Sequence, residues 1–442
     1  MKKPPFRGMY AALICLLFSV DLSAQSTYTQ IYQLLQAKCG TSGCHDGSNG
    51  LFNVMQPEAD VYSALVNQPP SNTVASAKGD RLVMPGYPQR SFLLRKIAYG
   101  ISDPLVIEAG EGNYQPENLT KMPDHEIELV RQWILYGAPQ TGKVIDTALI
   151  NTYYRVGGID DTYPDHAPPS PGTGFQIYFG KIFLAPGTET EIFIKHAPLL
   201  AEDIEIPRVH FMMPQACHHW VVYKFFPNQH TGYKEGIRPL DAGSHASTMD
   251  GICAGPGFLS YDLPEGTAYL WEAGTVLDLN LHIRNWSQDS ILAADLYTNF
   301  YTQPVGTATD YMLVRNFPNF LIWCLQDGNE YSFSAEAVDP DETGTWKIWK
   351  LYTHTHRYGT DFDVYLRNSD GTKGAQVYEG FYSYEQGFNV GYYRWGVDVT
   401  VRTFPDDELL EVDPKNGFIY EATYLNTDGP FLVTFGTKST DE

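Results

Sequence analysis

The sequence predicts a small all-α domain followed by two all-β antiparallel sandwiches. Three observations support this. The chain has 442 residues, more than one ordinary core accommodates. Apolar residues recur at helical spacing in the part of the chain that precedes residue 140. After residue 175, short runs rich in Ile, Val, Phe and Tyr alternate with Gly, Pro and Asp turns, as in antiparallel β proteins.

The composition narrows the class of protein. Hydrophobic residues make up 43% of the chain and charged residues 19%, so we expect a folded chain rather than a disordered one. The formal net charge of −22 argues against nucleic acid and against an anionic membrane surface as partners. Beyond the N-terminus we expect no membrane span, because no segment is long and apolar enough.

Residues 1–24 are predicted to be a secretory signal peptide. Basic residues at positions 2, 3 and 7 precede an apolar run at 9–20, and small residues at 22–24 offer a cleavage site. We therefore expect a periplasmic or secreted protein. In an oxidising compartment one disulfide could form among Cys217, Cys253 and Cys324, and Cys217–Cys253 is the pair we expect.

Two helices stand out in the first predicted domain, residues 25–145. Residues 28–37 carry apolar side chains at helical spacing. Residues 123–136 form an amphipathic helix, with Pro123 in its first turn and acidic residues near its positive end. Residues 146–174 follow, rich in Gly, Pro and Asp from 158 onward, and are predicted to be a linker.

The β-rich part divides into two predicted sandwiches, residues 175–310 and 311–442. Domains of about 130 residues fit the usual size range. The strands predicted in the first are 175–184, 189–195, 219–226, 276–283 and 293–301. Those predicted in the second are 331–338, 347–354, 361–367, 398–403 and 431–435.

The segment Cys39-Gly-Thr-Ser-Gly-Cys44-His45 indicates a site for covalent haem c. Such a site needs two thiols that add to the haem vinyl groups and a histidine that ligates iron directly after the second. Four residues separate the cysteines here, whereas the usual motif has two. The alternatives for this heptapeptide are a zinc site and a disulfide.

The surroundings of Met122 resemble the small cytochrome c domains fused to bacterial exported enzymes. The residues concerned are the stretch 83–91, Lys121-Met122-Pro123 and the amphipathic helix that follows. The resemblance implies that His45 is the proximal iron ligand and Met122 the distal one, with Met84 as the competing candidate. Ligation by His and Met leaves no open position on iron, so the domain would transfer electrons.

Two groups of histidines have metal-ligand spacing. His218 and His219 are adjacent, and on a regular strand they would point to opposite faces, so a shared metal requires an irregular backbone or a ring that folds back. His282 lies on a predicted strand, on the face opposite three leucines. His354 and His356 are two apart at the end of a predicted strand and therefore share a face. Imidazole-rich sites suit copper, although zinc is chemically possible.

The β-rich part resembles the copper type II, ascorbate-dependent monooxygenases. This family includes peptidylglycine α-hydroxylating monooxygenase and dopamine β-monooxygenase. The stretches that carry the resemblance are 217–223, 263–267 with 276–282, and 352–359. The resemblance implies two jelly-roll-like sandwiches that face a solvent cleft, with two copper sites.

In this family resemblance each histidine has an implied role. His218, His219 and His282 would bind the copper that supplies electrons. His354 and His356, together with a thioether, would bind the copper that activates dioxygen. The family's methionine ligand lies in a Thr/Ser-Asp-Glu-Met motif, whereas this sequence reads Thr440-Asp441-Glu442 and ends. We therefore expect the sequence to be truncated before that ligand, since Met312 is poorly placed to replace it.

The sequence thus predicts an exported copper-dependent monooxygenase. It would hydroxylate a C–H bond of a small-molecule or peptide substrate with dioxygen. Its electrons would come through the fused haem c domain, from a periplasmic donor or an ascorbate-like reductant. The first alternative is a non-catalytic periplasmic electron-transfer or copper-binding protein on the same fold. The second is a zinc-binding or metal-free sandwich with the cytochrome as a redox sensor.

Overall fold

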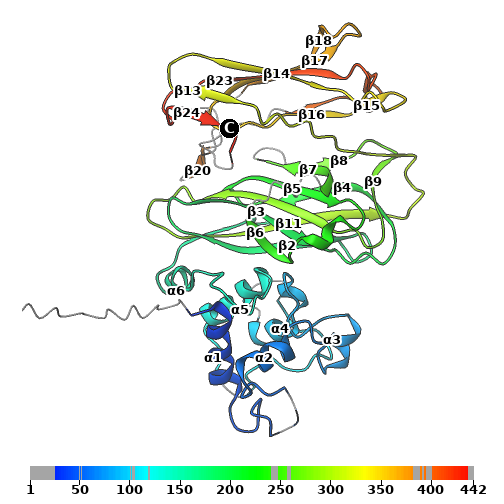
Figure 1. Cartoon of the computed structure of the whole chain (residues 1–442). Helices are drawn as coiled ribbons and strands as arrows, with labels where there is room; N and C mark the ends of the chain where they lie inside the picture. The colour runs from blue at the N-terminus through cyan, green and yellow to red at the C-terminus, as the bar shows by residue number, and fades with distance from the viewer. Residues whose placement is uncertain are drawn as a thin grey trace, which may run out of the picture.

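The computed structural model of the chain consists of one helical part and two β units stacked in layers (Figure 1). It describes residues 25–48, 50, 52–99, 101, 105–117, 120–239, 247–255, 260–381, 389–390, 393–394 and 401–436. The predicted signal peptide at 1–24 and the C-terminal motif at 437–442 lie outside the described residues. No helix among the described residues has the length and apolar character needed to cross a membrane.

Within the described residues, every α-helix lies between Thr27 and Val156. The helices are α1 (Thr27–Cys39), α2 (Glu58–Leu65), α3 (Thr73–Ala77), α4 (Phe92–Ala98), α5 (Asp124–Leu135) and α6 (Thr147–Val156), with a 3-10 turn, η1 (Pro88–Arg90). The predictions of α1 and α5 are confirmed. The Ser26 side chain caps α1 by accepting a hydrogen bond from the Thr29 N–H group. Tyr28 stacks on Trp133 of α5 with ring centroids 5.4 Å apart, in a common helical core.

Part of the predicted linker, residues 146–174, is regular structure. The Asp146 side chain caps α6 by accepting hydrogen bonds from the N–H groups of Ala148 and Leu149. Ile150 packs into the helical core. Strand β1 (Ile159–Thr162) pairs in parallel with residues 292–295 of the first β unit. Within this range, irregular chain is found at residues 157–158 and 163–173, and the predicted domain boundaries stay a prediction.

The first β unit consists of two sheets that share one core. The larger sheet contains β1, β2 (Gly174–Leu184), β4 (Ile204–Met212), β8 (Ser260–Asp262), β9 (Thr267–Trp271), β11 (Leu292–Gln303) and β12 (Asp310–Tyr311). The smaller sheet has the order β6 (Gly236–Pro239), β3 (Glu189–His196), β10 (Leu277–Arg284), β5 (Cys217–Phe225) and β7 (Thr248–Ala254). Trp220 of the smaller sheet donates a hydrogen bond to Thr298 of the larger one at 2.9 Å, which ties the two faces together.

The expected disulfide between Cys217 and Cys253 is absent. In the pairing of β5 with β7, Cys253 lies opposite Val221, four residues along the strand from Cys217. At ~3.3 Å per residue the two cysteines are separated by about 13 Å along the strand, and a disulfide requires Cα atoms within roughly 7 Å. Cys217 instead contacts the His219 carbonyl oxygen through its thiol, at 3.1 Å.

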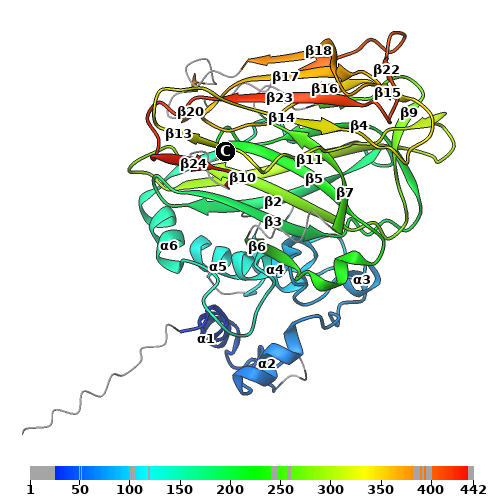
Figure 2. The same cartoon turned by 45° about the horizontal axis from the view of Figure 1, so that its top comes forward.

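The second β unit is built around a four-stranded antiparallel sheet (Figure 2). Its order is β14 (Tyr331–Ala337), β23 (Phe418–Tyr424), β17 (Gly359–Arg367) and β18 (Lys373–Phe381). Two-stranded ladders accompany it: β13 (Trp323–Leu325) with β24 (Leu432–Thr434), β15 (Trp346–Ile348) with β22 (Leu410–Val412), β16 (Lys350–Tyr352) with β21 (Val401–Thr403), and β19 (Asn389–Val390) with β20 (Tyr393–Arg394).

The predicted strand 347–354 is divided into β15 and β16, and it ends at Tyr352. His354 and His356 therefore lie in the connection to β17 rather than on a strand. The predominance of β-sheet confirms the coarse fold class. The assignment of the helical part as a cytochrome c domain stays a prediction.

A buried polar network joins the helical part to the first β unit. On α5, Arg131 pairs with Glu128 at 2.6 Å and donates to the Tyr178 hydroxyl of β2 at 3.0 Å. That hydroxyl in turn donates to Asp295 of β11 at 2.8 Å. All four side chains are buried, so each charge depends on its partners inside the protein.

The same interface brings three glycine backbones into direct contact. A Cβ atom on Gly236 would lie 2.3 Å from the Leu135 carbonyl oxygen and 2.7 Å from the Gly137 nitrogen. A Cβ on Gly86 would lie 2.7 Å from the Gly236 nitrogen. Gly236 also has a φ of +76°, which other residues rarely adopt. The helical part and β6 can approach this closely only because no side chain separates them.

His196, at this interface, should make stability depend on pH. Its ring lies 5.2 Å from the Tyr87 ring, and burial lowers its pKa to about 4. In the unfolded chain the pKa is about 6.5, so acid protonates the unfolded state first. We expect stability to fall as pH drops from ~6.5 to 4, by less than roughly 3 kcal/mol because the side chain keeps some contact with water. The midpoint of urea unfolding at pH 7 and at pH 4.5 measures this.

The His196→Gln variant is the control for this pH dependence. Its side chain stays neutral over the whole range, so the difference between its two midpoints should be smaller than in the wild type. Equal differences in both proteins would assign the acid sensitivity to other groups.

Candidate metal centre

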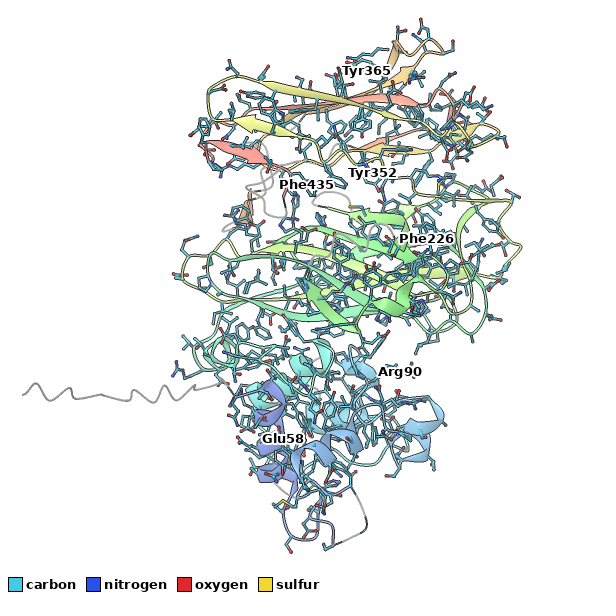
Figure 3. All side chains as sticks on the ribbon, in the orientation of Figure 1. Glu58, Arg90, Phe226, Tyr352, Tyr365 and Phe435 are labelled. Carbon is cyan, nitrogen blue, oxygen red and sulfur yellow. The ribbon has the colours of Figure 1, made fainter. Side chains whose placement is uncertain are left out.

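Five histidines from the two β units meet in one cluster. His218 and His219 are on β5, His282 is on β10, and His354 and His356 follow β16. The His218 ring is central, with its centroid 4.9 to 5.4 Å from those of the other four. Figure 3 marks Tyr352, the last residue of β16, on the side of the second β unit that faces the first. The two histidine groups predicted from the sequence thus form a single cluster.

A β-bulge places the adjacent His218 and His219 in the same cluster. In the pairing of β5 with β10, His219 lies opposite His282, and the next pair joins Cys217 to Ile283. His218 is therefore the extra residue of the bulge, where the alternation of side chains is interrupted. The two rings come within 5.4 Å of each other between centroids. The bulge is the irregular backbone that the adjacent His218 and His219 need in order to share one metal site.

The ligand atoms form two groups of three. One group is His218, His219 and His354, and the other is His218, His282 and His356; within each, the ligand atoms lie within 4.8 Å of one another. Each group combines residues of both β units, and His218 belongs to both. The rings of His218, His219 and His282, the set predicted for one copper, lie 5.1 to 5.4 Å apart between centroids. Each group of close ligand atoms, however, includes one histidine of the second β unit.

Polar side chains behind the cluster orient two of its rings. The His219 Nε2 atom lies 2.9 Å from the Asn280 Oδ1 atom, and Asn280 donates to Glu191 at 3.1 Å. The His282 Nε2 atom lies 2.6 Å from a carboxylate oxygen of Glu189. Because these bonds occupy Nε2, the nitrogen that can coordinate a metal is Nδ1, and in His219 it is buried with no hydrogen-bond partner in the described part of the chain.

Sequence reasoning missed these supporting residues. Glu189 and Glu191 lie two apart on β3, next to β10, and so share a face of the sheet. Acidic residues at period two on a strand are common on solvent-exposed faces, so the spacing alone did not distinguish them. Only the pairing of β3 with β10 brings them to the histidines.

Burial disfavours the protonated form of three of the five imidazoles, and it is the largest cause that lowers the pKa values of His218, His282 and His354. Burial, and then the neighbouring imidazoles, hold the pKa of His218 well below its usual value. The same causes lower the pKa of His354, although its side chain lies at the exposed edge of the cluster. Burial alone would raise the pKa of Glu191, but the His219 hydrogen bond and the charges of His219 and His282 lower it to about 2. Neutral imidazoles beside carboxylates are the state that binds a metal cation.

The donor set fits copper. All five candidate ligands are imidazoles, which bind copper more tightly than most divalent competitors, while zinc accepts the same donors. Met312 packs against the core of the first β unit. The C-terminal motif in which a thioether was expected lies outside the described residues.

The segment Cys39–His45 offers the two thiols and the imidazole that covalent attachment of haem c would need. Helix α1 ends at Cys39, and the His45 N–H donates to the Cys39 carbonyl at 3.0 Å, which folds the segment into a turn. The Cys39 and Cys44 thiols form no disulfide. The His45 Nδ1 atom lies 2.9 Å from the Phe52 carbonyl oxygen, which can only accept, so this bond needs the proton on Nδ1 and leaves the lone pair of Nε2 for iron. The Nε2 atom lies 3.4 Å from the Gln115 Oε1 atom.

The structure places the two candidate distal ligands differently. Met122 is buried at 1% exposure in the helical core, which Cys39 and Phe52 also contact. Met84 is half-buried, and its backbone N–H donates to the Ser91 hydroxyl at 2.9 Å. Met122 is thus the methionine that shares a core with the cysteine motif.

Comparisons with known proteins identify no family. No protein-family model matches the chain, and no curated protein does. Among solved structures, the PBSX exported protein XepA is 10% identical, covers 60% of this chain and 93% of its own, and has a TM-score of 0.17. The protein YhaK from Escherichia coli is 11% identical, covers 59% and 90%, and has a TM-score of 0.11. Likenesses at these TM-scores do not bear on the fold or the function.

Removing the supporting carboxylates should weaken metal binding. For Glu189→Gln and for Glu191→Gln we expect the affinity for Cu²⁺ or Zn²⁺ to fall about 10- to 100-fold, because each variant loses charge behind a ligand ring. Competition with a chromogenic chelator measures this. The control is Glu265→Gln, an exposed glutamate of the same β unit. Affinity that is unchanged in both variants would show that the carboxylates do not support the ligands.

Proposed function

We propose that the chain is an exported copper-dependent monooxygenase that hydroxylates a substrate C–H bond with dioxygen. The observation that carries the proposal is the convergence of five imidazoles from both β units, supported by Asn280, Glu189 and Glu191. Three separated stretches resemble the copper type II monooxygenases, and they supply these histidines. The proposal includes that family's two jelly-roll-like sandwiches.

The residues of the cluster have distinct tasks in this proposal. His219 and His282 are held by their Nε2 hydrogen bonds, which fixes the direction of each Nδ1 atom before a metal binds. His354 is the exposed member, so dioxygen and substrate would approach from its side. Bound copper supplies one-electron chemistry on dioxygen.

The helical part would deliver the electrons. Cys39 and Cys44 would attach haem c, and His45 and Met122 would ligate its iron. The Phe52 carbonyl holds His45 in the required tautomer. Bound haem stores one electron reversibly. A periplasmic carrier or an ascorbate-like reductant would supply it from outside.

Metal content per chain tests the proposal, on protein matured in a periplasm competent for haem c attachment. We expect one iron and two coppers, together with dioxygen consumption when a reductant is added. Iron and copper without dioxygen consumption would favour the electron-transfer or copper-binding alternative. Iron without copper, or zinc in its place, would overturn the copper mechanism.

A further inference from the structure

We propose that Asp161, on the strand that connects the helical part to the first β unit, is a positioning residue for the metal centre. Its carboxylate holds the turn that leads into His218 and His219. The inference rests on the proposed function for the identity of the metal, copper. It adds a residue that lies outside the three stretches that carry the resemblance to the monooxygenases.

The turn at residues 214–217 is held by both oxygens of this carboxylate. The carbonyl oxygen of the first residue of the turn accepts a hydrogen bond from the Cys217 N–H at 3.1 Å, which closes it. The N–H groups of the two central residues bind Asp161: Gln215 donates to Oδ1 at 3.1 Å, and Ala216 donates to Oδ2 at 2.9 Å. Because each oxygen accepts one of these bonds, the carboxylate fixes the orientation of the turn as well as its position.

The other side of the turn is joined to the strands that carry the ligands. The Ala216 carbonyl oxygen accepts a hydrogen bond at 3.1 Å from the N–H of Arg284, the last residue of β10. The Cys217 thiol contacts the His219 carbonyl oxygen at 3.1 Å, across the bulged residue His218. The turn therefore sets the point at which β5 departs from regular pairing, and the bulge begins directly after it.

The position of Asp161 in the chain gives this contact a wider meaning. Asp161 is the buried residue of β1, whereas its neighbour Asp160 is exposed. A buried carboxylate needs hydrogen-bond donors from the protein, and the turn supplies two of them. Strand β1 follows α6 after residues 157–158 and pairs in parallel with β11. The chain that leaves the helical part thus contacts the segment that carries two of the candidate ligands.

Two variants of Asp161 separate its position from its charge. In Asp161→Asn the amide oxygen can accept one of the two N–H groups, but the amide NH₂ group then faces the other. Asp161→Glu keeps the charge, but its longer side chain places the carboxylate differently. Both changes should displace the turn. The matched control is Asp160→Asn, which removes a charge from the exposed neighbouring residue.

The test measures Cu²⁺ affinity by competition with a chelator, and the electron paramagnetic resonance spectrum of the bound copper, on the full chain. In both Asp161 variants we expect an affinity about 10-fold below that of the wild type, and a changed copper hyperfine splitting. Asp160→Asn should match the wild type in both measurements. A purely structural role would lower the midpoint of unfolding without changing the spectrum of the copper that is bound.

Hydrogen exchange tests the same coupling without a variant. If Asp161 positions the ligands, copper must in turn stabilise the contact of β1 with the turn, because coupling between two sites is reciprocal. We expect Cu²⁺ to slow amide exchange at residues 159–162 of the wild type, measured by mass spectrometry. Unchanged exchange there would overturn the inference.

The outcomes separate this inference from the proposed function. Wild-type affinity and spectrum in both Asp161 variants would overturn the positioning role and leave the monooxygenase proposal standing. Wild-type values in Asp161→Glu alone would assign the effect to charge and would also overturn positioning. If the wild type binds no copper, the proposed function fails together with the inference.

Discussion

Replacing both Cys39 and Cys44 with serine is expected to abolish covalent haem attachment completely. The two thioether bonds require both thiols, and a serine hydroxyl does not add to the haem vinyl groups under the same conditions. Peroxidase staining after denaturing electrophoresis detects covalent haem, and the absorbance of the pyridine adduct counts it. Cys253→Ser, which changes a cysteine on β7 instead, should retain full haem content.

A variant of His45 separates attachment from iron ligation. His45→Ala keeps both thiols, so we expect covalent haem with an altered absorbance spectrum, since the Nε2 ligand is lost. If the double serine variant still carries haem, or if the wild type yields zinc in place of iron, the haem c assignment is wrong.

Arg131→Met is expected to destabilise the chain by about 3–5 kcal/mol. The change removes the cation from a buried pair and leaves the Glu128 carboxylate, at 0% exposure, without its main partner. The Tyr178 hydroxyl loses a donor at the same time, which weakens the link to β2. Urea unfolding followed by circular dichroism measures the loss.

An exposed ion pair at the start of the same helix, between Lys121 just before α5 and Asp124, its first residue, gives the matched control. Lys121 and Asp124 lie 2.8 Å apart, with side chains 41% and 47% exposed. Lys121→Met should change stability by less than about 1 kcal/mol, as for other surface pairs. A similar small effect in Arg131→Met would mean that water reaches the network between the helical part and the first β unit.

The sequence predicted the elements of this fold better than the relations between them. Helix α5 was predictable because its apolar residues recur at helical spacing next to Pro123 and acidic residues. Strand β10 was predictable from three alternating leucines, which do face the core and leave His282 on the other side. Helix α6 was missed because it is short, and its stability depends on Ile150 packing against residues distant in sequence.

In the candidate site, too, the residues were predictable from the sequence and their arrangement in space was not. Residue type and spacing were sufficient to select all five histidines. Their grouping was not predictable, because it depends on the bulge at His218 and on the way the connection after β16 meets β5 and β10. A sequence specifies the period of a strand far more directly than its register with a distant partner. The error over Cys217 and Cys253 has this same cause, since four residues of register separate them.

The glycine contacts between the helical part and β6 bear on how electrons would travel. At Gly86, Gly137 and Gly236 backbone meets backbone, so at these three positions no side-chain rotamer can alter the spacing. A haem attached to the helical part would thus have a constant tunnelling distance to the histidine cluster. Transfer between the two would not wait for a domain to swing, and its rate should be insensitive to solvent viscosity.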